Sequence, residues 1–427
     1  MLYNNRMMKL RAHQQRCLDA MRKHRKGQII VPTGGGKTLC MIRDADRQFN
    51  SCNWSVFVKN PDRKTIVVVS PRILLAQQHS EDFLSLLDVN PMLQVKPLHV
   101  HSGHVSQKCT TDPNDIVKWT EKNYRFNKII FTTYHSLHRI QESGINVDTI
   151  YFDEAHNAVQ RHFFTATEFF ANVDGIRCYF FTATPKHSST ISDPGMNDVE
   201  VFGKVLEQVS APELVVQKHI LPAKVVVKQL DMIKAGRPTP EKDAENVLKT
   251  ICELESTNDL IDGVVDYSNS LKKILICARR VSQIIRMTEE TNFCNQLQMR
   301  GYNWMYITAK HGGVINGESV SREYFFRTLE RWGKDDDMKF VVMHHSILSE
   351  GIDVPGLEAA LFMRNMNYIT MSQTIGRVIR KGNKEKRFGV CIVPTYDRVG
   401  ISTAKKLNAV VDTIFVKGQP AVGIAGR

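Results

Sequence analysis

Short β-rich runs alternate with helix-patterned stretches along the whole chain of 427 residues. In the first half the runs are QIIV, KTIVVVS, KIIFTTY, TIYFDEA and RCYFFTA; in the second half they are AKVVVKQL, KKILICA, WMYITAK, MKFVVMHH, EAALFMR and FGVCIVP. This alternation is typical of parallel α/β sheets, and the length fits two domains. We therefore expect an α/β fold of two tandem domains, each a mostly parallel sheet flanked by helices.

A segment punctuated by Gly and Pro, residues 201–222, separates the two sets of strands. Few contacts usually cross a domain boundary, and boundaries often fall in such segments. We expect a first domain over 1–210, a linker over 211–225 and a second domain over 226–427.

The chain is basic, with 57 Lys and Arg against 44 Asp and Glu and a formal net charge of +13. Counterion release then favours a polyanionic partner, although a solvated basic surface would have the same charge. Neither an export signal nor a run of about 18 apolar residues is present. We expect a soluble intracellular protein, in the cytoplasm or nucleoid of its host cell, with no membrane partner.

The nine cysteines form no C-x-x-C pair and no regular framework, so we interpret them as reduced thiols. A zinc site of His101, His104 and Cys109 is the alternative. It lacks a convincing fourth ligand, which a structural zinc site needs.

The strand QIIV leads into the glycine-rich segment PTGGGKT and then into a helix pattern. A strand, a glycine-rich turn and a helix in this order predict a phosphate-binding loop, whereas a merely flexible loop needs no such context. Lys37 would reach the β- and γ-phosphates, and the Thr38 hydroxyl would bind Mg²⁺. The predicted nucleotide-binding residues are Thr33, Gly34, Gly35, Gly36, Lys37 and Thr38.

Two further polar clusters follow strands of the first half, DEAH after TIYF and TATP after RCYFF. Asp153 would hold Mg²⁺, and Glu154 would orient and deprotonate an attacking water. His156 would sense the γ-phosphate or the other domain, and Thr182 and Thr184 would couple the carboxylates to bound nucleic acid. Alone, either tetrapeptide could be an ordinary turn; the phosphate loop upstream favours the functional interpretation.

In the second half, Arg377 and Arg380 lie three residues apart in QTIGRVIR. On a helix they would share one face, which suits two guanidinium groups aimed at one phosphate. Such arginines stabilise a transferring phosphoryl group. The alternative is a basic helix that contacts only the nucleic-acid backbone.

Taken in order, nine clusters resemble the motifs of superfamily 2 helicases. They are LRAHQ, VPTGGGKT, VSPRILLAQQ, FTTYHSL, DEAH, TATP, LICARR, SEGIDVP and QTIGRVIR. The likeness is nearest to restriction-enzyme motor subunits (ResIII) and to phage and repair DNA translocases. It implies two RecA-like domains with ATP between them and nucleic acid across both.

The resemblance also implies roles for residues that their own pattern does not assign. Arg11 and Gln14 match an adenine-recognising motif, and Gln373 joins the two arginines as a catalytic residue. The resemblance implies that Pro71, Arg72, Thr132 and Thr133 contact the nucleic-acid backbone. It also implies that Gly351 and Asp353 link the second domain to the nucleotide.

Two departures from the DEAD class of RNA helicases favour DNA as the partner. That class carries SAT where this chain has TATP, and His-Arg where it has Gln373-Thr374. We expect an ATP-dependent DNA helicase or translocase that uses ATP and Mg²⁺. The alternatives are an RNA helicase or RNA-stimulated ATPase, and an ATP-switched nucleic-acid clamp without productive hydrolysis. Whether the chain joins a larger complex stays open.

Overall fold

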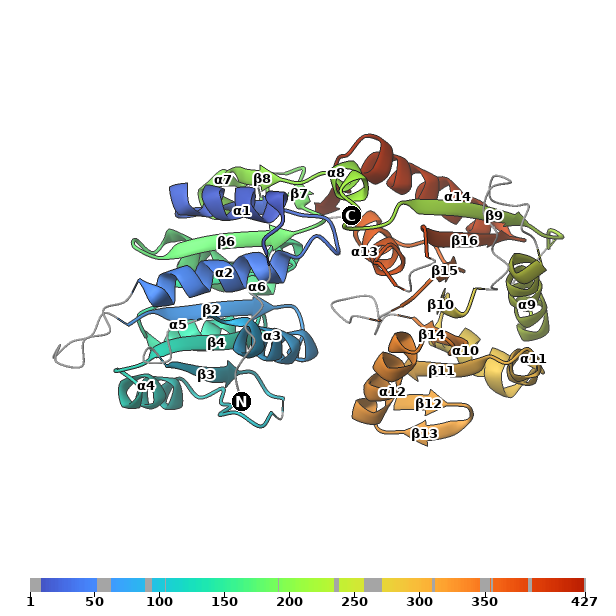
Figure 1. Ribbon diagram of the computed structural model, residues 1–427, viewed down its shortest axis with the longest axis horizontal. Coiled ribbons are helices and arrows are strands. Elements are labelled where there is room, and N and C mark those ends of the chain that lie inside the picture. The colour runs from blue at the N-terminus through green and yellow to red at the C-terminus, as the bar shows by residue number, and fades with distance from the viewer. Residues whose placement is uncertain are drawn as a thin grey trace. The chain divides into compact units, whose positions relative to one another are not determined.

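The computed structural model describes residues 9–51, 63–88, 94–103, 105–190, 192–233, 238–256, 271–308, 312–345, 354, 356–382 and 386–425. The chain divides into two compact units, one of Met1–Val209 with Val422–Arg427 and one of Ser210–Ala421. Each unit is built on one mostly parallel sheet flanked by helices (Figure 1), which confirms the predicted fold class.

The first unit contains a seven-stranded sheet in the order β3-β4-β2-β5-β6-β1-β8, with every pair parallel. Its strands are β1 (Lys26–Ile30), β2 (Thr65–Ser70), β3 (Val95–Val100), β4 (Asn127–Thr133), β5 (Thr149–Phe152), β6 (Arg177–Thr182) and β8 (Val205–Gln208). Its helices are α1 (Ala12–Lys23), α2 (Lys37–Asn50), α3 (Ile73–Leu86), α4 (Pro113–Lys122), α5 (Leu137–Ser143), α6 (Arg161–Asn172) and α7 (Val199–Phe202). A short strand, β7 (Lys186–Ser188), pairs with β17 (Gly423–Ala425).

The central strands of this sheet are buried along their whole length because helices cover both faces. All residues of β2, β4 and β5 are buried. Parallel pairing fixes which strand ends meet, since Ile30 of β1 is opposite Thr182 of β6, and Phe152 of β5 is opposite Phe180 of β6. The segments that follow β1, β5 and β6 therefore start at one edge of the sheet.

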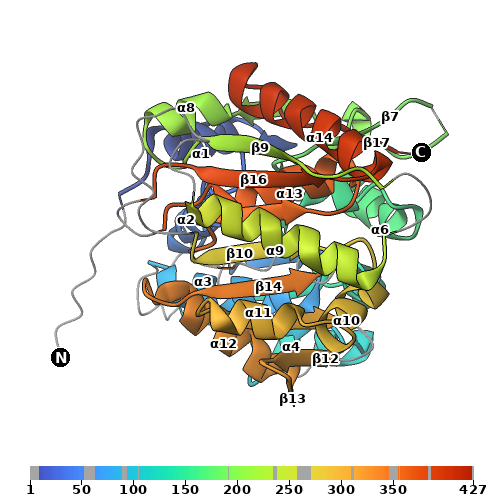
Figure 2. The same cartoon turned by 90° about the vertical axis from the view of Figure 1, so that its right-hand side faces the viewer.

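The second unit contains an eight-stranded sheet in the order β13-β12-β11-β14-β10-β15-β16-β9, antiparallel only at β11-β12 and β12-β13. Its strands are β9 (Ala223–Gln229), β10 (Lys273–Cys277), β11 (Asn303–Thr308), β12 (Gly312–Ile315), β13 (Glu318–Val320), β14 (Phe340–His344), β15 (Ala359–Phe362) and β16 (Gly389–Thr395). Its helices are α8 (Ala211–Val216), α9 (Pro240–Ser256), α10 (Val281–Glu289), α11 (Phe293–Met299), α12 (Arg322–Lys334), α13 (Tyr368–Val378) and α14 (Arg398–Val411), and a π-helical turn covers Asp412–Val416. Figure 2 shows α9, α10 and α11 over one face of this sheet, where their buried side chains form one core with the strands.

A buried polar network fixes α2 to the sheet of the first unit. Asp44 of α2 is fully buried and accepts hydrogen bonds from the Tyr151 hydroxyl (2.7 Å), the Gln48 amide (2.7 Å) and the Arg47 guanidinium (2.5 Å). Burial, and then the charge of Asp44, raise the pKa of Tyr151, so its hydroxyl stays protonated and donates. The network joins the helix after the phosphate loop to the strand before Asp153.

Replacing Tyr151 with Phe should therefore destabilise the first unit. Loss of the tyrosine hydroxyl deprives both Asp44 and Gln48 of a buried hydrogen-bond partner. We therefore expect the free energy of unfolding to fall by about 1–3 kcal/mol. Hydrogen exchange of β5 amides across a urea series would measure opening of this unit alone. The matched control is Tyr124→Phe, at a half-exposed tyrosine, with a change within about 0.5 kcal/mol. Equal effects of the two substitutions would contradict the assignment.

Candidate functional site

The predicted phosphate loop runs from the end of β1 into the N-terminus of α2. Gly34 and Gly36 have φ of +84° and +85°, a left-handed conformation that favours glycine. Lys37 is the first residue of the helix. Backbone N–H groups at the start of a helix have no partner within the helix and carry partial positive charge, so the loop has the local structure of an anion site.

The start of α1 supports this loop from the side. The Gln14 amide nitrogen lies 3.4 Å from the carbonyl oxygens of both Gly35 and Gly36, and its oxygen accepts a hydrogen bond from the Arg11 backbone N–H (2.9 Å). Nε2 of His13 lies 2.7 Å from the Gly35 carbonyl oxygen. The structure thus places Arg11 and Gln14 beside the loop and adds His13, which the sequence pattern did not single out.

The acidic pair follows β5, and Glu154 has an unusual backbone conformation. Its φ of +47° and ψ of +53° are left-handed, which costs a residue with a side chain roughly 1–2 kcal/mol. The Asn157 amide donates to the Glu154 carbonyl oxygen (3.0 Å). Oε1 of Glu154 lies 3.4 Å from Nζ of Lys37. The carboxylate and the phosphate-loop lysine, far apart in sequence, are therefore in contact.

Asp153 is buried, and two residues hold it in place. Nε2 of His79 donates to its Oδ2 (2.9 Å), and the Tyr134 hydroxyl donates to its backbone carbonyl oxygen (2.8 Å). Burial raises the pKa of Asp153, but the hydrogen bond to His79 and the charges of His79 and Lys37 outweigh burial, so this pKa lies below its usual value. Asp153 is therefore a carboxylate at neutral pH. Neither His79 nor Tyr134 was predicted.

Each carboxylate of the acidic pair has one oxygen available for the group expected from the sequence, Mg²⁺ at Asp153 and the attacking water at Glu154. Oδ1 of Asp153 and Oε2 of Glu154 are buried and have no hydrogen-bond partner among the described residues. A buried carboxylate oxygen is costly unless it is hydrogen-bonded or coordinates a cation, and oxygen is the ligand that Mg²⁺ prefers. The chemistry of these donors suits a hard cation.

The DEAH and TATP clusters meet through His156. Its Nδ1 lies 3.1 Å from the Thr182 hydroxyl, 3.5 Å from the Thr184 hydroxyl and 3.6 Å from Oε2 of Glu154. The Asn157 amide approaches Nε2 on the other side of the ring, at 3.3 Å. His156, predicted to sense the γ-phosphate or the other domain, thus lies beside Thr182 and Thr184, predicted to couple the carboxylates to nucleic acid.

The four residues matched to nucleic-acid contacts have different environments. Pro71 and Arg72 directly follow β2, and Arg72 is the N-cap of α3. Thr132 is fully buried, and its hydroxyl donates to the Val100 carbonyl oxygen of β3 (2.8 Å). The Thr133 hydroxyl is buried and lies 3.4 Å from the Ser136 hydroxyl. The hydroxyl of Thr132 therefore stabilises the pairing of β4 with β3.

In the second unit, the expectation that Arg377 and Arg380 share one helix face is wrong. Helix α13 ends at Val378, so Arg380 lies two residues beyond it. The Ile379 carbonyl oxygen accepts a hydrogen bond from the Leu221 N–H (2.7 Å), a partner outside the helix. The first carbonyl group beyond the helix therefore bonds to another segment of the second unit.

Gln373 and Arg377 are both buried within α13. Burial, followed by the positive charges of Arg377 and Arg364, lowers the pKa of His344 well below its usual value. His344 at the end of β14 is therefore neutral near Arg377. Gly351 and Asp353 lie outside the described residues.

The zinc alternative receives no support from the part of the chain that the structure describes, where no group of three or more metal-ligating side chains occurs. Sγ of Cys109 is 3.8 Å from Nδ1 of His101, and His104 is outside the described residues. The cysteines within the described ranges are free thiols. None of the described helices is long and apolar enough to cross a membrane.

Comparisons with known proteins agree with this geometry. Residues 7–187 match the family model described as type III restriction enzyme, res subunit. The fold is similar to that of the ATP-dependent type ISP restriction-modification enzyme LlaBIII bound to DNA, with 16% identity and a TM-score of 0.70 over 97% of this chain and 31% of that chain. No curated protein sequence matches the chain.

Two more solved structures share the fold. One is a putative HsdR subunit of a type I restriction enzyme from Vibrio vulnificus YJ016, with 15% identity and a TM-score of 0.59 over 97% of this chain and 67% of that chain. The other is Mss116p bound to ssRNA and AMP-PNP, with 16% identity and a TM-score of 0.60 over 97% of this chain and 74% of that chain.

Both units thus have the mostly parallel α/β fold of RecA-like helicase domains, and residues 7–187 are similar to the res subunit of type III restriction enzymes. The predicted resemblance to restriction-enzyme motor subunits is confirmed. The comparisons also agree with the predicted enzyme class, a nucleic-acid-dependent ATPase. The chain spans about a third of the length of LlaBIII (31%) and of a second type ISP restriction-modification enzyme with a similar fold, LlaGI (30%).

A buried histidine near the site predicts a pH dependence of stability. His99 is fully buried between His101 and Ser80; burial, and then the charge of His101, lower its pKa from 6.5 to about 4. The unfolded chain binds this proton at higher pH than the folded chain, so stability falls as pH drops from 6.5 towards 4. His99→Gln should flatten unfolding free energies in this window, and parallel curves for both proteins would contradict the prediction.

Proposed function

We propose that this chain is an ATP-driven motor that couples hydrolysis to movement along DNA or to its unwinding. The contact between Lys37 and Glu154 beside the buried Asp153 is the observation that carries the proposal. It brings together a phosphate loop, a lysine, a carboxylate suited to binding Mg²⁺ and a carboxylate suited to accepting a proton at one edge of the sheet. Phosphoryl transfer to water requires these groups.

Lys37 and Glu154 act in sequence in this proposal. The loop N–H groups and Lys37 bind the β- and γ-phosphates of ATP, whose charge replaces Glu154 as the partner of Lys37. Oε1 of Glu154, 3.4 Å from Nζ of Lys37 before binding, then orients the attacking water and accepts its proton. The strained backbone of Glu154 holds this carboxylate in place.

Thr38 and Asp153 would hold Mg²⁺ in this site, and when bound the ion neutralises charge on the phosphate oxygens. The depressed pKa of Asp153 keeps its carboxylate deprotonated and ready for a cation.

Coupling to movement is assigned to two groups of residues. His156 contacts Glu154, Thr182 and Thr184, so a change at the carboxylate alters hydrogen bonds at the end of β6. We assign Gln373, Arg377 and Arg380 of the second unit to the charge of the transferring phosphoryl group, and Gly351 and Asp353 to the link with nucleotide.

DNA is the proposed partner. Support comes from the TATP and Gln373-Thr374 sequences and from the similarity to enzymes whose structures contain DNA. Pro71, Arg72, Thr132 and Thr133 are the proposed contacts to the backbone. The similarity to Mss116p bound to ssRNA makes RNA the second candidate.

Substitution of the two central residues should abolish turnover. Glu154→Gln keeps the shape of the site but removes the proton acceptor, so we expect kcat for ATP to fall about 10²- to 10⁴-fold. Lys37→Ala should also weaken nucleotide binding. A coupled assay of ATP hydrolysis would measure both, with exposed Lys23→Ala as the matched control. If both variants hydrolyse ATP as fast as the parent, Lys37 and Glu154 do not have the proposed roles.

Stimulation of ATP hydrolysis distinguishes the candidate partners. We expect duplex DNA to raise kcat more than RNA of equal length at every salt concentration, while apparent affinity falls linearly with the logarithm of salt. Greater stimulation by RNA would favour the RNA-dependent enzyme. ATP-dependent binding of DNA without turnover would indicate a clamp.

A further inference from the structure

Helix α3 places two polar side chains on its buried face. The buried residues of this helix are Leu75, Ala76, His79, Ser80 and Phe83, spaced as one helical stripe. A buried polar group is costly unless it is hydrogen-bonded, so each polar member of this stripe needs a partner. The Ser80 hydroxyl lies 3.1 Å from Nε2 of His99, whereas His79 bonds to Asp153.

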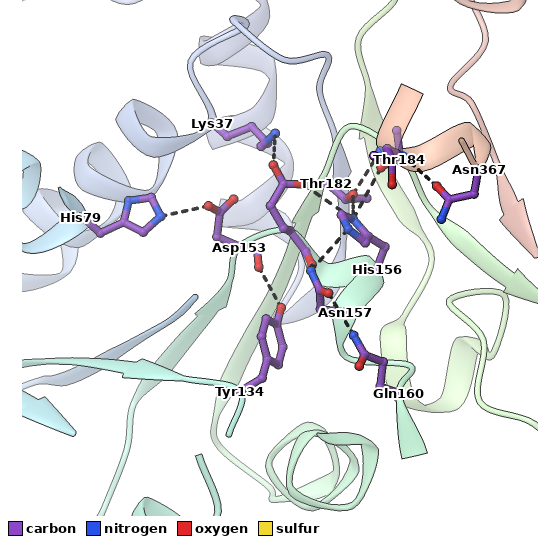
Figure 3. A network of polar contacts seen from close by, with 12 residues as sticks. Lys37, His79, Tyr134, Asp153, His156, Asn157, Gln160, Thr182, Thr184 and Asn367 are labelled. Carbon is purple, nitrogen blue, oxygen red and sulfur yellow. Dashed lines mark hydrogen bonds and ion pairs between the residues drawn. The ribbon is translucent and has the colours of Figure 1, made fainter. Parts of the chain in front are cut away.

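The contact of His79 reaches the proposed metal-binding carboxylate directly. Nε2 of His79 is 2.9 Å from Oδ2 of Asp153, and both side chains are almost completely excluded from solvent (Figure 3). Tyr134 meanwhile fixes the backbone carbonyl of Asp153. One oxygen of the carboxylate is thereby occupied, and Oδ1 is the oxygen without a hydrogen-bond partner among the described residues.

We propose that His79 is a positioning residue of the nucleotide site, which fixes the Asp153 carboxylate so that Oδ1 faces the metal ion. The proposal rests on the proposed function, because it needs Asp153 to bind Mg²⁺. The terminal torsion of an aspartate is broad and nearly two-fold, so a hydrogen bond to one oxygen selects the orientation of the other. Partners of metal ligands commonly have this effect and typically change metal affinity or activity 10- to 100-fold.

This role does not follow from the resemblance to helicases. His79 lies one residue beyond the cluster VSPRILLAQQ on which that resemblance rests. The assignment comes from its burial on the inner face of α3 and from its hydrogen bond to Asp153.

The test compares nucleotide binding with and without Mg²⁺ in four variants of the full chain. His79→Leu removes the donor, His79→Asn keeps polarity but is too short to reach Asp153, and His79→Gln keeps an N–H donor at similar reach. Ser80→Ala removes the neighbouring buried hydrogen bond without touching Asp153. Binding of a fluorescent non-hydrolysable ATP analogue is titrated in Mg²⁺ and in EDTA, and melting without nucleotide monitors folding.

For the parent we expect Mg²⁺ to tighten binding of the analogue. In His79→Leu and His79→Asn that gain should shrink about 10-fold or more, while affinity in EDTA stays at the level of the parent. His79→Gln and Ser80→Ala should keep most of the gain. The Mg²⁺ concentration that half-saturates ATP hydrolysis should rise in the same two variants that lose the gain.

The outcomes separate the two proposals. A full Mg²⁺ gain in His79→Asn, or an equal loss in His79→Asn and Ser80→Ala, would overturn the role of His79 while the proposed function stands. Absence of any Mg²⁺ gain in the parent would overturn the proposed function and the role of His79 with it. His79→Asn keeps a polar side chain at the buried position, so it carries the test even where His79→Leu does not fold.

Discussion

Parallel hydrogen bonding between β1, β5 and β6 is the constraint on which the site depends. Because Ile30 is opposite Thr182 and Phe152 is opposite Phe180, the chain leaves all three strands at one edge of the sheet. The phosphate loop, the acidic pair and the TATP turn thus begin close together although more than a hundred residues separate the first from the second. A shift of register would reverse the faces on which these side chains lie.

The buried polar network around Asp44 stabilises that arrangement. It ties α2, whose first residue is Lys37, to β5, whose next residue is Asp153. The lysine and the two carboxylates are therefore positioned by a buried framework and not by their own mutual attraction. In the proposed mechanism, this framework keeps Lys37 and Glu154, which lie 3.4 Å apart, in place when phosphate replaces the carboxylate as the partner of the lysine.

Much of this could be predicted from sequence because it depends on local patterns. Apolar runs with β-branched residues specify strands, and GGGKT between a strand and a helix specifies the loop. The supporting residues His79, Tyr134 and His13 could not be predicted, because each acts through a tertiary contact with no sequence spacing of its own.

Two other features also depend on tertiary structure. The left-handed backbone of Glu154 is not typical of glutamate, and its hydrogen-bonded neighbour Asn157 supports it. Helix α13 ends before Arg380, and the Ile379 carbonyl group just beyond it bonds to the N–H of Leu221, more than 150 residues earlier in the chain. The spacing of the two arginines does not show where the helix ends.

In the proposed function, ATP hydrolysis at this site moves the protein along DNA. Displacement of a fluorescent third strand from a triplex site on linear duplex DNA measures such movement directly. We expect ATP-dependent displacement that is delayed in proportion to the distance travelled and absent in Lys37→Ala. Robust DNA-stimulated ATP hydrolysis with neither triplex displacement nor strand separation would contradict it.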